Sequence, residues 1–133
     1  MKIQSLWEYR GQKRPSFAIT PGEGQESVWD YPRPPRIVPD ARRVEVSSGG
    51  QLLASTNSAF RILETASPPT FYLPAADVDL ARLVRVAGSS ACEWKGLAGY
   101  WALGGDPSHC AVGWSYEKPL AEFAMIAGWL SFY

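Results

Sequence analysis

Proline and glycine divide this chain into short runs, and this constrains its fold more than any other feature. The sequence holds eleven prolines and twelve glycines in 133 residues. Proline ends regular structure because it has no backbone N–H donor, and glycine favours tight turns. Many short strands between such turns predict a mainly β fold. The sequence has no regular alternation of strands and helices, which is the pattern that would indicate a parallel sheet.

One hairpin can be predicted with its turn. In "RRVEVSS", residues 42–48, Val44 and Val46 fall on one face, and charged residues fall on the other. Gly49-Gly50 is a turn signal, and "QLLAS" follows it. This pattern predicts two antiparallel strands joined by a glycine turn. The remaining segments are read as a strand or short helix at 59–65, strands at 70–74, 83–86 and 111–117, a helical turn at 75–78, and a short helix running into a strand at 121–133.

The first 41 residues differ from the rest of the chain. They hold more than half of the prolines, and "YPRPPRIVPD" can be neither a helix interior nor a central strand. We therefore expect residues 1–41 to form an extended arm that packs on a single β domain of residues 42–133. Trp29 and Tyr31 are the expected anchors. A polyproline ligand for a partner domain is the alternative, because Pro32 and Pro35 form a P-x-x-P pattern.

Charge and cysteine content set aside several classes of function. Thirteen basic residues balance thirteen acidic ones, so no net field attracts nucleic acid or an anionic membrane. No apolar run has the length of a signal peptide core or a membrane span, so we expect a soluble cytoplasmic protein. Two cysteines, Cys92 and Cys110, form no C-x-x-C pair, so we expect no zinc or other metal and no cofactor. The single histidine, His109, lies in a polar turn and is a poor triad member.

The stretch "SSACEWKGLAGYW", residues 89–101, concentrates reactive and aromatic side chains. Read as one strand, it places Cys92, Trp94 and Tyr100 on one face and Glu93, Lys95 and Trp101 on the other. Gly96 and Gly99 favour a bulge, which would exchange the faces beyond it.

Several motifs, in their order and spacing, resemble a known family. These are "ESVWDYPRPP", "RRVEV", "RILET" with "PPTFYLP", "CEWKG", "WSYEKP" and the final "FY". Together they resemble the family named domain of unknown function 427 over about residues 26–133. The resemblance implies an Mss4-like β-tent fold: two antiparallel sheets with short helical turns, here preceded by the proline-rich arm. Some catalogues label the family a nucleotidyltransferase, but this chain shows no paired metal-binding aspartates and no glycine-serine loop. Family members often carry a histidine where this chain has Ser67.

The aromatic and charged residues of these motifs define a candidate site. The aromatic rings could form the wall of a ligand pocket or an ordinary aromatic core. Cys92 could be a nucleophile assisted by Lys95, or a small buried residue without reactivity. The candidate ligand-binding residues are Trp94, Trp114, Tyr72, Tyr100, Tyr116, Glu93 and Arg61, and the candidate catalytic residues are Glu93, Cys92 and Lys95.

Three functions remain open at this point. The first is a domain that binds a small planar or cationic molecule in an aromatic pocket. The second is a small-molecule enzyme, such as a transferase, that uses Glu93 or Cys92. The third is a protein-interaction module. The expected partner is an unknown small molecule, and the expected state is a monomer or a homodimer.

Overall fold

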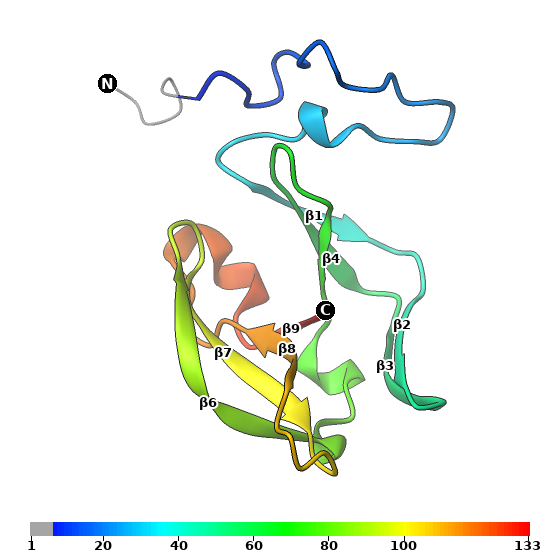
Figure 1. Cartoon of the computed structure of the whole chain (residues 1–133), viewed down its shortest axis with the longest axis vertical. Helices are drawn as coiled ribbons and strands as arrows, with labels where there is room; N and C mark the ends of the chain where they lie inside the picture. Colours follow the sequence, from blue (N-terminus) through cyan, green and yellow to red (C-terminus); the bar gives the residue numbers. More distant parts are fainter. Residues whose placement is uncertain (1–6) are drawn as a thin grey trace. The chain divides into compact units, whose positions relative to one another are not determined.

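The computed structural model describes residues 7–133 and confirms the mainly β class (Figure 1). Over these residues the chain forms nine strands in three antiparallel sheets, and its helical elements are short 3-10 turns. The family resemblance implied two sheets, whereas the strands divide into three hydrogen-bonded sets in the orders β1-β4-β5, β2-β3 and β6-β7-β8-β9. The strands are β1 Arg36–Asp40, β2 Val44–Ser48, β3 Gln51–Thr56, β4 Ala59–Leu63, β5 Thr70–Tyr72, β6 Leu83–Cys92, β7 Gly96–Leu103, β8 Ala111–Ser115 and β9 Leu130–Phe132.

The helical elements among residues 7–133 are short 3-10 turns. They are η2 Val28–Asp30, η3 Ala75–Asp77, η4 Leu80–Arg82 and η5 Ala121–Ile126. The predicted turn after Pro74 and the predicted short helix before the last strand are confirmed as η3 and η5. The ambiguous segment 59–65 is a strand, β4, over most of its length. No helix within residues 7–133 is long and apolar enough to span a membrane.

The chain divides into two compact units, which do not coincide with the predicted boundary after residue 41. The first unit comprises the described residues up to Val38 together with Arg61–Thr70, and the second comprises Pro39–Phe60 and Phe71–Tyr133. The expected packing of the proline-rich arm on the β domain stays a prediction.

Tyr31 is the best buried aromatic residue of the first unit, with 7% of its surface exposed. Its hydroxyl donates a hydrogen bond to Glu26 Oε1 at 2.7 Å, and its carbonyl accepts one from the buried Thr65 hydroxyl at 2.5 Å. Trp29 is only half-buried and meets the rings of Tyr9 and Phe17 edge to face. The hydrogen bond from Thr65 holds the segment around Tyr31 to the turn that follows β4 within the same unit.

The predicted glycine hairpin in the second unit is confirmed. Strands β2 and β3 pair antiparallel from Val44 opposite Thr56 to Ser48 opposite Gln51. Gly49 and Gly50 form the turn with φ of +57° and +78°, a left-handed conformation that side chains with a Cβ disfavour. The hairpin therefore closes where the sequence indicated.

The prediction that residues 89–101 form one strand is wrong. Strand β6 ends at Cys92, residues 93–95 form a turn, and β7 begins at Gly96 and runs back antiparallel. Gly96 has a φ of +105°, which permits the reversal. Because the chain turns here, the predicted division of six side chains between two faces of one strand no longer applies.

Apolar side chains from separate segments form the core of the second unit. The buried set is Ala54, Leu73, Val78, Leu83 and Leu130. Leu73 and Leu130 also exchange two backbone hydrogen bonds, of 2.8 and 2.9 Å. This bridge fixes the end of β5 beside β9, at the edge of the four-stranded sheet.

Candidate functional site

Three of the predicted aromatic residues form a packed cluster in the second unit. Trp114 on β8 donates from its indole N–H to the Tyr72 hydroxyl at 3.0 Å, and the two rings meet edge to face. The Tyr116 ring lies 6.4 Å from the Tyr72 ring, centroid to centroid. Tyr72 has no exposed surface and Tyr116 has 6%. The centre of the predicted pocket is therefore filled by its own rings.

Burial changes the acid–base character of the two tyrosines. It raises the pKa of Tyr72 to about 12, because the phenolate would lose its hydration. Burial also raises the pKa of Tyr116, and the neighbouring Tyr72 and Cys92 contribute in the same direction. Both phenols therefore stay protonated at neutral pH, so they can act as hydrogen-bond partners but not as general bases.

Two predicted catalytic residues lie beside this aromatic cluster. The Lys95 ammonium lies 5.8 Å from the centre of the Tyr116 ring, within cation–π range. Cys92 is a free, half-buried thiol and is one of the neighbours that raise the pKa of Tyr116. Tyr100 contributes a weaker electrostatic effect on Tyr116, and its own hydroxyl contacts Ser90 Oγ at 2.5 Å. The structure thus brings Cys92 and Lys95 to the rings that the sequence selected.

The remaining predicted residues are Glu93, Trp94 and Arg61. Glu93 and Trp94 are in the turn between β6 and β7, where Glu93 is exposed and Trp94 half-buried. Arg61 belongs to the first unit, where its guanidinium pairs with Glu26 at 2.9 Å.

Trp101 takes part in a second polar network, which the sequence did not predict. Its indole N–H donates to Ser115 Oγ at 3.0 Å, and Ser115 donates to Glu117 Oε1 at 2.8 Å. Arg85 binds the same carboxylate oxygen at 3.0 Å and stacks over the Trp101 ring, 4.6 Å from its centre. Because each polar group in this series of hydrogen bonds has a partner, the network stabilises the four-stranded sheet.

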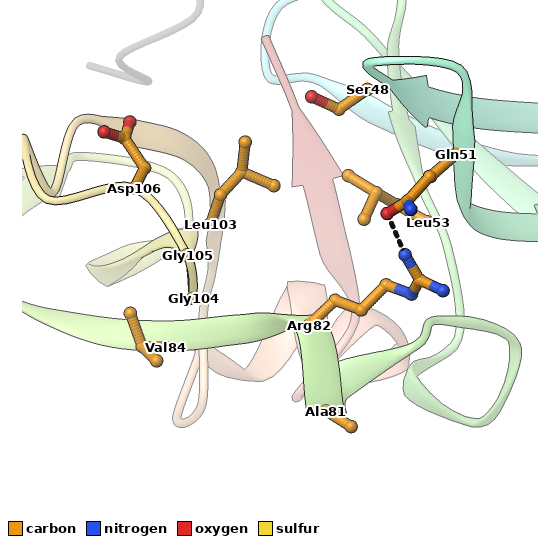
Figure 2. A pocket seen from close by; sticks show the side chains of 10 residues that line it. All are labelled: Ser48, Gln51, Leu53, Ala81, Arg82, Val84, Leu103, Gly104, Gly105 and Asp106. Atoms are coloured by element: carbon orange, nitrogen blue, oxygen red, sulfur yellow. Dashed lines mark hydrogen bonds between the residues drawn. The ribbon is translucent and has the colours of Figure 1, made fainter.

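A cavity of about 590 Å³ lies in the second unit, and no residue of the aromatic cluster lines it (Figure 2). We call it the hairpin cavity, because one wall comes from the β2–β3 hairpin. The other walls come from η4, the start of β6, and the end of β7 with the glycines after it. The residues that line the cavity are Ser48, Gln51, Leu53, Ala81, Arg82, Val84, Leu103, Gly104, Gly105 and Asp106, and they include no predicted site residue.

Arg82 supplies the cation of this cavity and is held at two points. Its Nε donates to Asp79 Oδ2 at 2.8 Å, and its Nη1 donates to Gln51 Oε1 (Figure 2). A guanidinium carries five N–H donors. The remaining three have no hydrogen-bond partner among residues 7–133, so the fork is oriented and still able to bind an acceptor.

Asp106 supplies an anion on another wall. In Figure 2 it lies on the opposite side of Leu103 from Arg82. Its carboxylate accepts from the Ser108 backbone N–H at 2.9 Å and from the Ser108 hydroxyl at 2.8 Å. These hydrogen bonds lower the pKa of Asp106, so the group is a stable carboxylate at neutral pH.

Sequence reasoning missed this cavity for a physical reason. Its charged residues are 24 positions apart in the sequence, between Arg82 and Asp106, and no spacing rule joins them. Gly104-Gly105 before Asp106-Pro107 is a local signal near the cavity, but this pattern indicates only a polar turn.

A smaller cavity of about 370 Å³ lies beside the stacked rings of Phe60 and Trp129, whose centres are 4.8 Å apart. Its acidic residue, Asp40, binds the Arg42 guanidinium through both carboxylate oxygens. This cavity therefore offers an aromatic wall and an acid that is already paired. Within residues 7–133 no group of three His, Cys, Asp or Glu side chains is placed to hold a metal ion.

The comparisons with known proteins agree with the motifs. No curated protein sequence matches the chain. A family model described as a domain of unknown function, DUF427, matches residues 36–133, which is more than half of the chain and includes every strand. The chain therefore belongs to the family of domain of unknown function 427.

Proposed function

We propose that this protein binds a small organic molecule in the hairpin cavity. The observation that carries the proposal is the cavity itself: about 590 Å³, with an apolar floor and a few oriented polar groups. Binding sites for small molecules commonly have volumes of about 300–1,000 Å³ and combine apolar walls with a few placed polar groups. Leu53, Val84 and Leu103 form the apolar part, and Arg82 and Asp106 the charged part.

The aromatic cluster is a second candidate location for a planar or cationic ligand. Trp114 and Tyr100 are half-buried, so parts of their rings could contact a ligand. Two observations favour a structural role instead. Tyr72 and Tyr116 are buried against each other, and the cation–π position over Tyr116 already holds Lys95.

Catalysis at Cys92 or Glu93 is a weaker alternative. A nucleophilic cysteine is normally activated by a cationic neighbour, and no hydrogen bond joins the Cys92 thiol to a cationic side chain among residues 7–133. Glu93 is exposed in its turn, so burial does not separate its carboxylate from solvent. Cys92→Ser and Glu93→Gln test this alternative in any assay that detects turnover.

The proposal can be tested by screening the full-length, ¹⁵N-labelled protein by NMR against amines, carboxylates, amino acids, nucleotides and cyclic imides. We expect binders to shift the backbone amide signals of Gln51, Gly104 and Gly105. Gly105→Trp should abolish this binding. A Cβ at Gly105 meets no atom within 4 Å, so the indole can enter the cavity mouth without backbone strain.

Ala76→Trp is the matched control. Ala76 is exposed in η3 and is not among the residues that line the cavity, so the added ring should leave binding unchanged. Binders that shift Tyr100, Lys95 and Trp114 instead, and that Gly105→Trp does not affect, would place the ligand site at the aromatic cluster and refute the proposal.

A further inference from the structure

We propose that the hairpin cavity selects a linear ligand with a protonated amine at one end and a carboxylate or similar acceptor at the other. This inference rests on the proposed function and assigns the ligand class to the same cavity. Its three steps concern the charges at the cavity, the donors of Arg82 and Gln51, and the apolar surface between the charges.

The charges at the cavity favour an amine. Arg82 contributes one positive charge, while its partner Asp79 and the separate Asp106 contribute two negative charges. Because Asp79, outside the cavity wall, offsets the charge of Arg82, Asp106 is the lining charge that a ligand meets without a salt-bridge partner among residues 7–133, and it favours a protonated amine over a simple anion. Both oxygens of Asp106 accept hydrogen bonds from Ser108, and each keeps a further lone pair for a ligand N–H.

The other end of the ligand requires an acceptor. Arg82 has three unused N–H donors among residues 7–133, in the planar fork that matches a carboxylate. The Gln51 side-chain oxygen accepts from Arg82, which leaves the amide NH₂ of Gln51 as a further donor. Because Asp79 already offsets the charge of Arg82, this end orients the ligand more than it attracts it.

An aliphatic chain suits the surface between the two charged ends. Leu103 lies between Asp106 and Arg82 in Figure 2, and Val84 and Leu53 lie on the same cavity. No aromatic ring lines the described walls, so stacking of a planar ligand has no partner there. The apolar contact is that of methylene groups, each of which gains about 0.8 kcal/mol when it is fully buried.

Three probes of matched length test the ligand class: 6-aminohexanoate, hexylamine and hexanoate. Each is titrated into the full-length ¹⁵N-labelled protein at low ionic strength, and the dissociation constant is taken from the Gly104 and Gly105 amide shifts. We expect 6-aminohexanoate and hexylamine to bind, and hexanoate to bind roughly tenfold more weakly because it has no partner for Asp106.

Two single variants assign the ends. Asp106→Asn should weaken hexylamine and 6-aminohexanoate roughly three- to tenfold and leave hexanoate unchanged or stronger. Asp79→Asn, outside the cavity wall, releases Arg82 from its carboxylate and should strengthen hexanoate severalfold. Asp79 is exposed and Asp106 half-buried, so both variants should keep the wild-type fold, with amide signals that change only near the substituted residue. Asp106→Asn loses one of the two hydrogen bonds from Ser108, because an amide NH₂ cannot accept.

Each result is decisive. The inference is overturned if hexanoate binds as tightly as hexylamine, if Asp106→Asn leaves amine binding unchanged, or if the probes shift only residues of the aromatic cluster. If no probe binds but other molecules shift the cavity amides and are excluded by Gly105→Trp, the ligand class is wrong and the proposed function stands. If Gly105→Trp leaves every interaction intact, the proposed site itself is wrong.

Discussion

The buried hydroxyl of Tyr72 should make the stability of this protein fall at alkaline pH. The raised pKa, about 12, means that the folded protein keeps the phenolic proton after the unfolded chain has lost it. The unfolded pKa is about 10. The stabilising contribution is therefore complete below pH 10 and is lost as the pH rises from about 10 to about 12.

The size of the effect follows from the pKa shift. A shift of about two pKa units corresponds to about 2.7 kcal/mol of unfolding free energy, of which about 1.4 kcal/mol is already lost at pH 11. Tyr72→Phe removes this loss but leaves the Trp114 indole N–H without its acceptor. That should cost about 1–2 kcal/mol at neutral pH. The wild-type and variant stabilities should therefore become equal near about pH 11.

Urea unfolding followed by tryptophan fluorescence at pH 8, 10 and 11 measures the effect. Tyr133→Phe is the control, because it removes the hydroxyl of a residue that is 80% exposed. Tyr116 contributes in the same direction, so Tyr72→Phe should retain part of the alkaline loss. A constant difference between wild type and Tyr72→Phe from pH 8 to pH 11 would refute the argument, because it would mean that the Tyr72 hydroxyl titrates alike in both states.

Two further predictions concern packing. Leu73→Ala removes a core side chain that is 1% exposed and should lower the unfolding free energy by about 2–5 kcal/mol. Leu97→Ala, at a position that is 64% exposed, should change the unfolding free energy by under about 1 kcal/mol. Equal urea midpoints for the two variants would contradict the assigned core. Gly113→Ala places a Cβ 2.6 Å from the Ser131 carbonyl oxygen and should lower the unfolding free energy by roughly 1–3 kcal/mol. Gly105→Ala is the control, because its Cβ meets nothing within 4 Å. A thermal melt that finds Gly113→Ala as stable as the wild type would show that β8 and β9 do not approach so closely.

Local chemistry made much of the fold predictable. Gly49-Gly50 fixed the β2–β3 turn, and Pro74 preceded the predicted turn η3. The error at residues 89–101 has a clear source. "CEWKG" alternates like a strand, but the reversal depends on a single left-handed glycine, Gly96, and three turn residues. Alternation alone cannot separate one long strand from two paired strands when the turn has no proline or Asn-Gly signal.

The candidate site was less predictable because it depends on pairing between strands. The rings of Tyr72, Trp114 and Tyr116 do pack against one another, and alternation puts Trp114 and Tyr116 on one side of β8 and its continuation, but their role in ligand binding stays a prediction. Arg82 and Asp106 became neighbours of one cavity only through the pairing of β6 with β7, where Leu83 lies opposite Leu103. That register is long-range information, and no local pattern carried it.

The abundance of aromatic residues suggested a ligand pocket, but the structure uses these rings for internal contacts. In the second unit Trp101 donates to Ser115, Trp114 donates to Tyr72, and Trp129 stacks on Phe60. Large rings with one polar atom supply both buried area and a directional hydrogen bond. Rings that already pack against one another offer little free surface to a ligand. We therefore expect a ligand to bind at a wall of small aliphatic residues and oriented charges. The hairpin cavity has that composition, which is why we assign binding to Arg82 and Asp106 and structural stability to the aromatic cluster.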